Sequence, residues 1–164
     1  MPRLFLEKSR NDEKISIMLK VKIKSFEALT KHELYYLLQL RSEVFVVEQD
    51  CVYQDLDGKD EKALHVLGFK NEKLVAYTRI FKPGDYFEET SIGRVVVSKN
   101  ERQFKYGYTI MKASIEAIKD HFNTSKIKIS AQCYLKKFYT NLGFKAVGEE
   151  YLEDGIPHMA MVKE

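Results

Sequence analysis

The residues with the clearest chemical potential are two basic side chains and a glycine at a helix start: Arg102, Lys105 and Gly107. They follow an apolar run, Ile92 to Val97, at the point where a helical pattern begins. The first turn of a helix leaves backbone N–H groups without acceptors and carries the positive end of the helix dipole. Because positive side chains are unfavourable there unless an anion compensates them, the sequence predicts a phosphate-binding loop.

A second candidate for chemistry is Tyr139, in a short helical pattern that stops at Gly143. A phenol has a pKa near ~10, so it is protonated at neutral pH and can give a proton to a leaving group. The chain has ten tyrosines and ten phenylalanines, and a packing role is the alternative that the residue type alone suggests.

The elements that must position these residues are read from the spacing of apolar side chains. A capping box at Thr30 and Glu33 starts the first helix, and Asn71 to Lys73 form a short hairpin connection. Alternating or continuous apolar runs predict strands, and apolar residues at helical spacing predict helices. The pattern predicts strands over 19–25, 64–69, 74–81, 92–97, 126–131, 144–152 and 158–162, and helices over 30–47, 106–121 and 134–142.

Composition narrows the class of protein. The length of 164 residues suits one domain, and 45% hydrophobic and 31% charged residues are typical of a soluble globular chain. The net charge of +3 is spread along the chain, which argues against a nucleic-acid partner. No apolar run is long enough to span a bilayer, so we expect no membrane partner.

Cys51 and Cys133 are too few for a disulfide framework or, with the four histidines, a metal site. We therefore expect no metal and a reducing, cytoplasmic location. Residues 1–17 are charged and without periodicity, and we expect a disordered N-terminal extension there, with Met18 an equally good start. Residues 18–164 are expected to form a single domain.

Several motifs occur together in one order. They are RVVVS at 94–98, R-x-x-K-x-G at 102–107, FY-x-x-x-GF at 138–144 and EDGIPH at 153–158, with VFVVEQ at 44–49 and YQDLDG at 53–58 upstream. On these residues the chain resembles the GNAT superfamily of N-acyltransferases, and within it the ElaA-like branch. Several motifs in order are much stronger evidence than one short loop.

The resemblance implies an α/β fold: a mixed, mostly antiparallel sheet with helices on both faces. Its central parallel pair, the strands at 92–97 and 126–131, is expected to splay apart and admit the cofactor. The implied co-substrate is acetyl-CoA. The strand before the loop would hold its pantetheine arm, and the loop and helix start would hold its diphosphate. The implied cofactor-binding residues are Val95, Val96, Val97, Arg102, Gln103, Phe104, Lys105, Tyr106, Gly107, Tyr108, Gln132 and Phe138.

One position departs from the family pattern. Lys105 stands where the first glycine of the loop is expected. We expect Lys105 to keep a right-handed helical conformation, so that the backbone cradle is retained, and its ammonium to add a charge-assisted contact.

The implied reaction is transfer of an acetyl group from acetyl-CoA to a primary amine by direct attack. Tyr139 matches the family's general acid. A free alkylamine has a pKa near ~10.4, so a base must help to remove its proton. Glu48, His65 and His158 are the candidates, and a water relay without a single base is the alternative.

The acceptor is not readable from the sequence. The loop over 48–61 and the hairpin near His158 are expected to line its side, and their acidic residues suggest a cationic amine. The loop acids match a calcium loop only loosely, and Cys133 lacks a nucleophile signature. The rivals are a CoA-binding sensor or partner module without turnover, and an RNA-binding sheet suggested by Phe81 and Tyr86. A homodimer is left open because GNAT proteins often pair through sheets or terminal strands.

Overall fold

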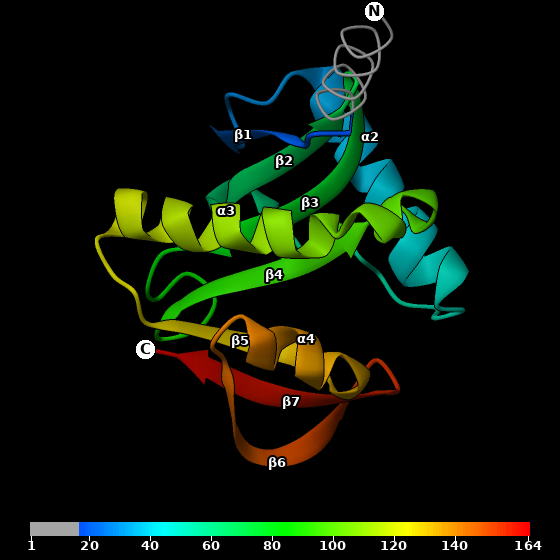
Figure 1. The fold of residues 1–164 in the computed structure, drawn as a ribbon. Coiled ribbons are helices and arrows are strands. Elements are labelled where there is room, and N and C mark those ends of the chain that lie inside the picture. Colours follow the sequence, from blue (N-terminus) through cyan, green and yellow to red (C-terminus); the bar gives the residue numbers. More distant parts are fainter. Residues whose placement is uncertain (1–16) are drawn as a thin grey trace, which may run out of the picture.

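Seven strands form one sheet, in the order β1-β2-β3-β4-β5-β7-β6, in the computed structural model, which describes residues 17–164 (Figure 1). All strand pairs in it are antiparallel except β4 with β5, which confirms the predicted mixed sheet. The predicted extension over 1–17 lies, except for Ile17, outside the described residues. The strands are β1 (Lys20–Ser25), β2 (Leu64–Lys70), β3 (Lys73–Phe81), β4 (Thr90–Val97), β5 (Ile127–Gln132), β6 (Lys145–Glu153) and β7 (Ile156–Lys163).

The α-helices are α2 (Lys31–Arg41), α3 (Tyr106–Phe122) and α4 (Lys136–Asn141). The predicted capping box is present at the start of α2. Thr30 Oγ1 accepts a hydrogen bond from the Glu33 amide at 3.1 Å, and Glu33 Oε2 accepts one from the Thr30 amide at 3.0 Å. Both atoms satisfy donors that the helix start leaves free.

The end of this helix differs from the expectation. The α-helix was expected to run to about residue 47, but it ends at Arg41 and continues as a π-helical segment, η1 (Ser42–Glu48). Wider turns continue beyond it, with the Gln49 amide bonded to the Val44 carbonyl at 3.1 Å and the Cys51 amide to Val46 at 3.1 Å. Apolar spacing alone does not distinguish these two helix types, and π-helical turns occur often at functional sites.

The predicted hairpin between β2 and β3 is confirmed. Its two connecting residues, Asn71 and Glu72, have φ values of 47° and 68°. Two consecutive residues with positive φ are the mark of a type I′ turn, whose twist matches that of the paired strands.

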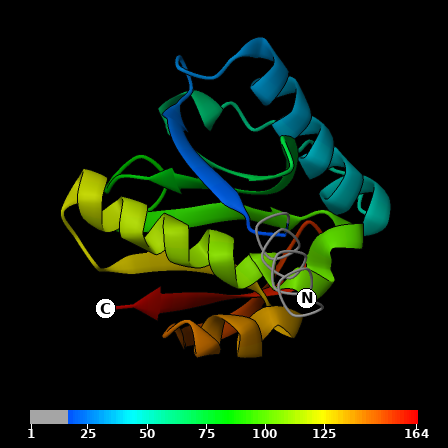
Figure 2. The same cartoon turned by 45° about the horizontal axis from the view of Figure 1, so that its top comes forward.

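Helices cover both faces of the sheet, as predicted. Leu37, Leu40 and Val44 pack from α2 and η1 against Leu67 and Val96 on one face. Helices α3 and α4 pack on the other face, where α3 and the strands form the larger core (Figure 2). Its fully buried members include Val66, Ala76, Ile80, Ile110, Met111, Ile118, Ile127 and Met161.

The parallel pair separates after a short contact. Strands β4 and β5 are in register only at Thr90 with Ile127 and at Ser91 with Lys128, and then diverge (Figure 1). The splay that the resemblance implied is therefore present.

Strand β4 also contains a bulge that the sequence did not reveal. Tyr77 of β3 pairs with Val96 and Arg79 pairs with Gly93, so β4 has one extra residue between these pairs. Arg94 lies in this bulge with a φ of +49°, in the left-handed region that side chains rarely adopt.

A second irregularity lies at the far edge of the sheet. Val147 of β6 pairs with Ala160 of β7, whereas Tyr151 pairs with His158, so β6 has additional residues between the two pairs. Gly148 lies there with a φ of +75°, a conformation that glycine adopts without strain.

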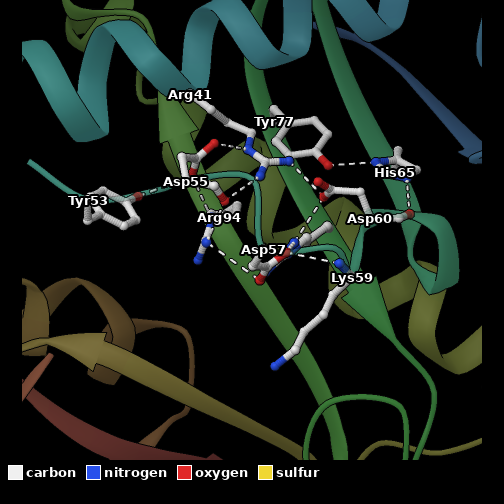
Figure 3. A network of polar contacts seen from close by, with 10 residues as sticks. Arg41, Tyr53, Asp55, Asp57, Lys59, Asp60, His65, Tyr77 and Arg94 are labelled. Carbon is white, nitrogen blue, oxygen red and sulfur yellow. Dashed lines mark hydrogen bonds and ion pairs between the residues drawn. The ribbon is translucent and has the colours of Figure 1, made fainter. Parts of the chain in front are cut away.

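On the face of β3 and β4 that α2 covers, a set of buried ion pairs fixes the loop that follows η1 (Figure 3). We call it the ion network, and its members are Arg41, Arg79, Arg94, Asp55, Asp57 and Asp60. Arg41 and Arg79 are 0% and 1% exposed. Asp55, Asp57 and Asp60 therefore neutralise buried arginines, and the cationic amine that the loop acids suggested stays a prediction.

The ion network makes stability depend on pH. Burial opposes ionisation of Asp57 and Asp60, but hydrogen bonds and charge from Arg79 and Arg41 outweigh it and hold the pKa of both carboxyls below the usual range. The folded state therefore binds fewer protons than the unfolded state near their unfolded pKa of ~3.9. This stabilisation is fully present above that pKa and is lost as pH falls below it.

We accordingly expect the free energy of unfolding to fall as pH is lowered from 5 to 3, and Asp57→Asn to show a shallower fall, by up to about 1.4 kcal/mol per pH unit. Denaturant titrations at a series of pH values measure it. Asp120→Asn, on the exposed surface of α3, is the matched control and should keep the wild-type slope. An equal slope in wild type and Asp57→Asn contradicts the assignment.

Candidate active site

A cavity of about 450 Å³ opens where β4 and β5 diverge. Its walls come from both strands, from η1, from the start of α3, from α4 and from the turn between β6 and β7. The volume lies in the range of small-molecule sites, roughly 300 to 1,000 Å³. Glu48, Arg94, Tyr139 and His158, which are far apart in the sequence, face this one space.

Arg102 lies at the α3 end of the cavity. Its Nη1 and Nη2 donate to the two carboxylate oxygens of Glu48, at 2.7 and 2.9 Å, and its Nε donates to the Val97 carbonyl at 3.2 Å. The guanidinium is 43% exposed. The two Nη atoms of Arg102 thus bind a carboxylate as a bidentate pair, which is the geometry in which a guanidinium binds an oxyanion best.

Lys105 does not adopt the conformation that we expected. Its φ and ψ are 59° and 32°, in the left-handed region, and it forms the N-cap of α3. The chain must turn sharply from the 3₁₀ segment η3 (Lys99–Phe104) into α3, and a left-handed residue makes that turn. The family's glycine would adopt this geometry more easily, so Lys105 replaces it at some conformational cost.

The turn also narrows the set of amides that can bind an anion. The Lys105 amide donates to the Arg102 carbonyl at 3.2 Å, and the Tyr108 amide donates to the Lys105 carbonyl at 3.1 Å. Helix geometry leaves the amides of Tyr106 and Gly107 without an intrahelical acceptor. These two amides are therefore the best donors for a phosphate.

Gly107 allows α4 to approach the start of α3. A Cβ atom built on Gly107 would lie 3.3 Å from the ring of Phe138, closer than ordinary contact. The Phe138 ring packs at 4.8 Å from that of Tyr108, and Asn141 Nδ2 donates to the Tyr108 hydroxyl at 3.1 Å. The absence of a side chain at Gly107 thus lets the two helices that flank the cavity, α3 and α4, pack closely together.

The implied cofactor residues divide into two groups. Phe104 and Tyr106 are not among the residues that line the cavity: Phe104 packs under the Lys70 ammonium, and the Tyr106 hydroxyl donates to the Ile17 carbonyl. Gln103 is exposed and also lies outside the lining. The others line it: Val95, Val96, Val97, Arg102, Lys105, Gly107, Tyr108, Gln132 and Phe138.

Tyr139 lies in the cavity wall and is 5% exposed. Phe138 and Phe144 pack edge-on against its ring, at centroid distances of 5.0 and 6.0 Å. Burial, with a smaller effect of Tyr134, raises the pKa of the Tyr139 phenol above its usual range. The hydroxyl therefore stays protonated at neutral pH, where it can donate a hydrogen bond and cannot act as a base.

His158, on β7, also lines the cavity and is 6% exposed. Its Nδ1 is 2.7 Å from the Ile156 carbonyl, which only a protonated Nδ1 can satisfy, and its Nε2 is 3.1 Å from Glu153 Oε2. Ser130 and Tyr151 are hydrogen-bonded beside this pair. Side chains from β5, β6 and β7 thus form a polar cluster at one side of the cavity.

His65 lies away from the cavity, so the expectation that it could reach the reacting amine as a base is wrong. It is fully buried in β2 and is not among the residues that line the cavity. Its Nδ1 bonds the Tyr77 hydroxyl at 2.6 Å and its Nε2 bonds the Asp60 carbonyl at 2.9 Å (Figure 3). Burial lowers the pKa of His65, consistent with a neutral ring that connects the ion network to β2 and β3.

Sequence reasoning missed several residues of the lining. Gln49 Nε2 donates to Gln132 Oε1 at 3.0 Å and so connects the end of η1 to β5 in the lining of the cavity. Arg94 was missed because nothing in the sequence shows the β4 bulge, and Tyr53 was missed because it lies in a loop without a periodic pattern. The motif YQDLDG at 53–58 was the available signal for Tyr53 and its loop.

Within residues 17–164, no group of three acidic, histidine or cysteine side chains is arranged to hold a metal ion. In the same part of the chain, no helix has the length and apolar character needed to cross a membrane.

Comparison with known proteins agrees with this geometry. The acetyltransferase (GNAT) domain family matches residues 25–164, and the chain belongs to that family. Within the family it is similar to protein ElaA of Escherichia coli, with 47% identity over 138 residues, which cover 83% of this chain and 90% of ElaA.

Solved structures show the same relation. The crystal structure of Escherichia coli ElaA superimposes with a TM-score of 0.83 at 44% identity, over 90% of this chain and 100% of that one. An acyl-CoA N-acyltransferase from Pseudomonas aeruginosa superimposes with a TM-score of 0.83 at 40% identity and covers 90% of this chain. The ElaA-like branch that the motifs indicated is therefore confirmed.

Proposed function

We propose that this protein transfers an acetyl group from acetyl-CoA to a primary amine. The single observation that carries the proposal is the cavity between β4 and β5, which extends from the start of α3 to a buried phenol on α4. The similarity to an acyl-CoA N-acyltransferase supports an acyl-CoA donor, and the acetyl group and the amine are part of the proposal. We also propose a single catalytic domain over 18–164 and a cytoplasmic location.

In this proposal the cofactor follows the open edge of β4. Its diphosphate binds the amides of Tyr106 and Gly107 with Arg102, and its pantetheine arm bonds the backbone of Val95 to Val97. That backbone edge is available because β5 leaves β4 after Ser91, whereas the other edge pairs with β3. The backbone N–H group of Val95, in the bulge, polarises the thioester carbonyl.

The reaction then needs two proton movements. The amine nitrogen attacks the thioester carbon, the carbon–sulfur bond breaks, and Tyr139 gives a proton or a hydrogen bond to the sulfur that leaves. The pair of His158 and Glu153 receives the proton that the amine loses, directly or through water. Glu48 is proposed instead to hold Arg102, because both of its carboxylate oxygens are bonded there.

Arg102→Ala tests the diphosphate site. Loss of charge-assisted bonds should weaken acetyl-CoA binding by about tenfold or more, as isothermal titration measures. Lys119→Ala, in the last turn of α3, is the matched control and should bind as the wild type does. Equal affinity of Arg102→Ala and wild type contradicts the site.

Tyr139→Phe tests the acid. It removes only the hydroxyl of a buried ring, so acetyl-CoA affinity should stay within about twofold while kcat falls by roughly 10²-fold. Release of free thiol in the presence of a panel of amines measures kcat. An unchanged kcat removes this role from Tyr139. If the wild type binds acetyl-CoA but releases no thiol with any amine, the alternative is favoured, a CoA-binding module without turnover.

A pair of variants tests the base. His158→Gln should lower kcat by about 10²-fold, whereas Glu48→Gln should act mainly on the KM for acetyl-CoA. Kinetics at varied acetyl-CoA and pH separate the two effects, and circular dichroism checks the fold of each variant. A collapse of kcat only in Glu48→Gln would transfer the role to Glu48, and full kcat in both would favour the water relay.

A further inference from the structure

The bulge in β4 has an unusual occupant. Arg94 has a φ of +49°, while the adjacent Gly93, which could adopt that geometry freely, does not have a positive φ. A long L side chain in this region is strained and persists only where surrounding contacts enforce the conformation. Something in the fold must therefore hold Arg94 in place.

The holding contact is Asp55. Arg94 Nε lies 2.8 Å from Asp55 Oδ1, and Arg94 Nη2 donates to the Asp55 backbone carbonyl at 2.9 Å (Figure 3). The contact with the Asp55 carboxylate is an ion pair without hydrogen-bond geometry at Nε, and the bond from Nη2 to the Asp55 carbonyl fixes the direction of the guanidinium. Asp57 Oδ2 is farther away, at 3.6 Å from Nη2.

Asp55 is itself held from the other side. Arg41 Nε donates to its Oδ2 at 2.8 Å, Arg41 Nη2 donates to its carbonyl at 3.2 Å, and the Tyr53 hydroxyl donates to its Oδ1 at 3.1 Å. The Asp55 side chain is only 4% exposed. Arg41 is the last residue of α2, so the chain of contacts runs from the core of the molecule to the bulge.

We propose that Asp55 and Arg94 are a positioning pair that holds the β4 bulge in its left-handed form, and thereby aims the backbone N–H group of Val95 into the cavity. This inference rests on the proposed function, since that group is the proposed donor to the thioester carbonyl. Arg94 affects the site through its backbone conformation, whereas its positive charge serves only to form the ion pair with Asp55.

A matched pair of substitutions tests this directly. Arg94→Ala loses the anchor but keeps a Cβ atom, so the bulge should relax and kcat should fall by about 10²-fold, as for loss of an oxyanion donor. Arg94→Gly also loses the anchor, but glycine adopts positive φ without strain, so kcat should stay within about fivefold of wild type. KM for acetyl-CoA should change less than kcat in both, because the diphosphate contacts at Arg102 and α3 are untouched.

Asp55→Asn should lower kcat as Arg94→Ala does, and combining it with Arg94→Gly should restore most of that loss. Asp57→Asn is the control, because its carboxylate mainly holds Arg79, and it should lower stability without a comparable loss of kcat. Equal loss in Arg94→Ala and Arg94→Gly, or no loss in either, overturns the proposal.

A second measurement does not depend on turnover. The backbone amide signals of Val95 and Val96 in NMR spectra should shift strongly in Arg94→Ala and remain near wild type in Arg94→Gly. The opposite pattern, or similar spectra for both, overturns the positioning role even if the enzyme is active. If the wild type shows no transfer with any amine, the proposed function fails, and these spectra still decide whether Asp55 holds the bulge.

Discussion

The divergence of β4 and β5 after two register pairs is the constraint on which the site depends. Strands that stayed paired would fill the space with hydrogen bonds and side chains, and no cavity would remain. Each strand keeps one partner beyond the divergence, β3 for β4 and β7 for β5. Each therefore keeps its own ladder while the edge that faces the gap is left for a ligand.

Different interactions maintain the two sides of the gap. On the β4 side, buried charges tie the bulge to α2, and such pairs are directional and costly to break by removing one partner. On the β5 side, α4 is held by aromatic packing around Tyr139 and by the close approach of Gly107 and Phe138. Between them, neutral hydrogen bonds such as that of Gln49 with Gln132 connect lining residues of the cavity, and these are weak enough to exchange for a ligand.

The sequence was sufficient to predict the order of helices and strands and those cavity-lining residues that belong to recognisable motifs. The hairpin at Asn71, the capping box at Thr30 and the parallel pair all follow from local patterns or from the resemblance. The sequence was insufficient to predict the parts of the site whose geometry depends on an unusual backbone conformation. Nothing in the residue type shows that Arg94 and Lys105 have positive φ, since both prefer other regions.

Burial of charge was the other limit. In the sequence, the acids of the loop and the distant arginines look like residues of a solvated surface. Only the fold brings Asp55 into contact with Arg41 and Asp57 into contact with Arg79. His65 was misplaced for the same reason: a histidine at the start of a strand can face either side, and here both nitrogens are used inside the protein.

The bulge at Gly148 has a consequence for the outer border of the molecule. Strand β6 is exposed along its whole length and ends the sheet, a position where strands from other molecules could add on. Because its pairing register shifts between Val147 and Tyr151, that border is bent and divided into two short stretches. A straight incoming strand can match only one of them at a time, which protects the free border from continuous growth into fibres.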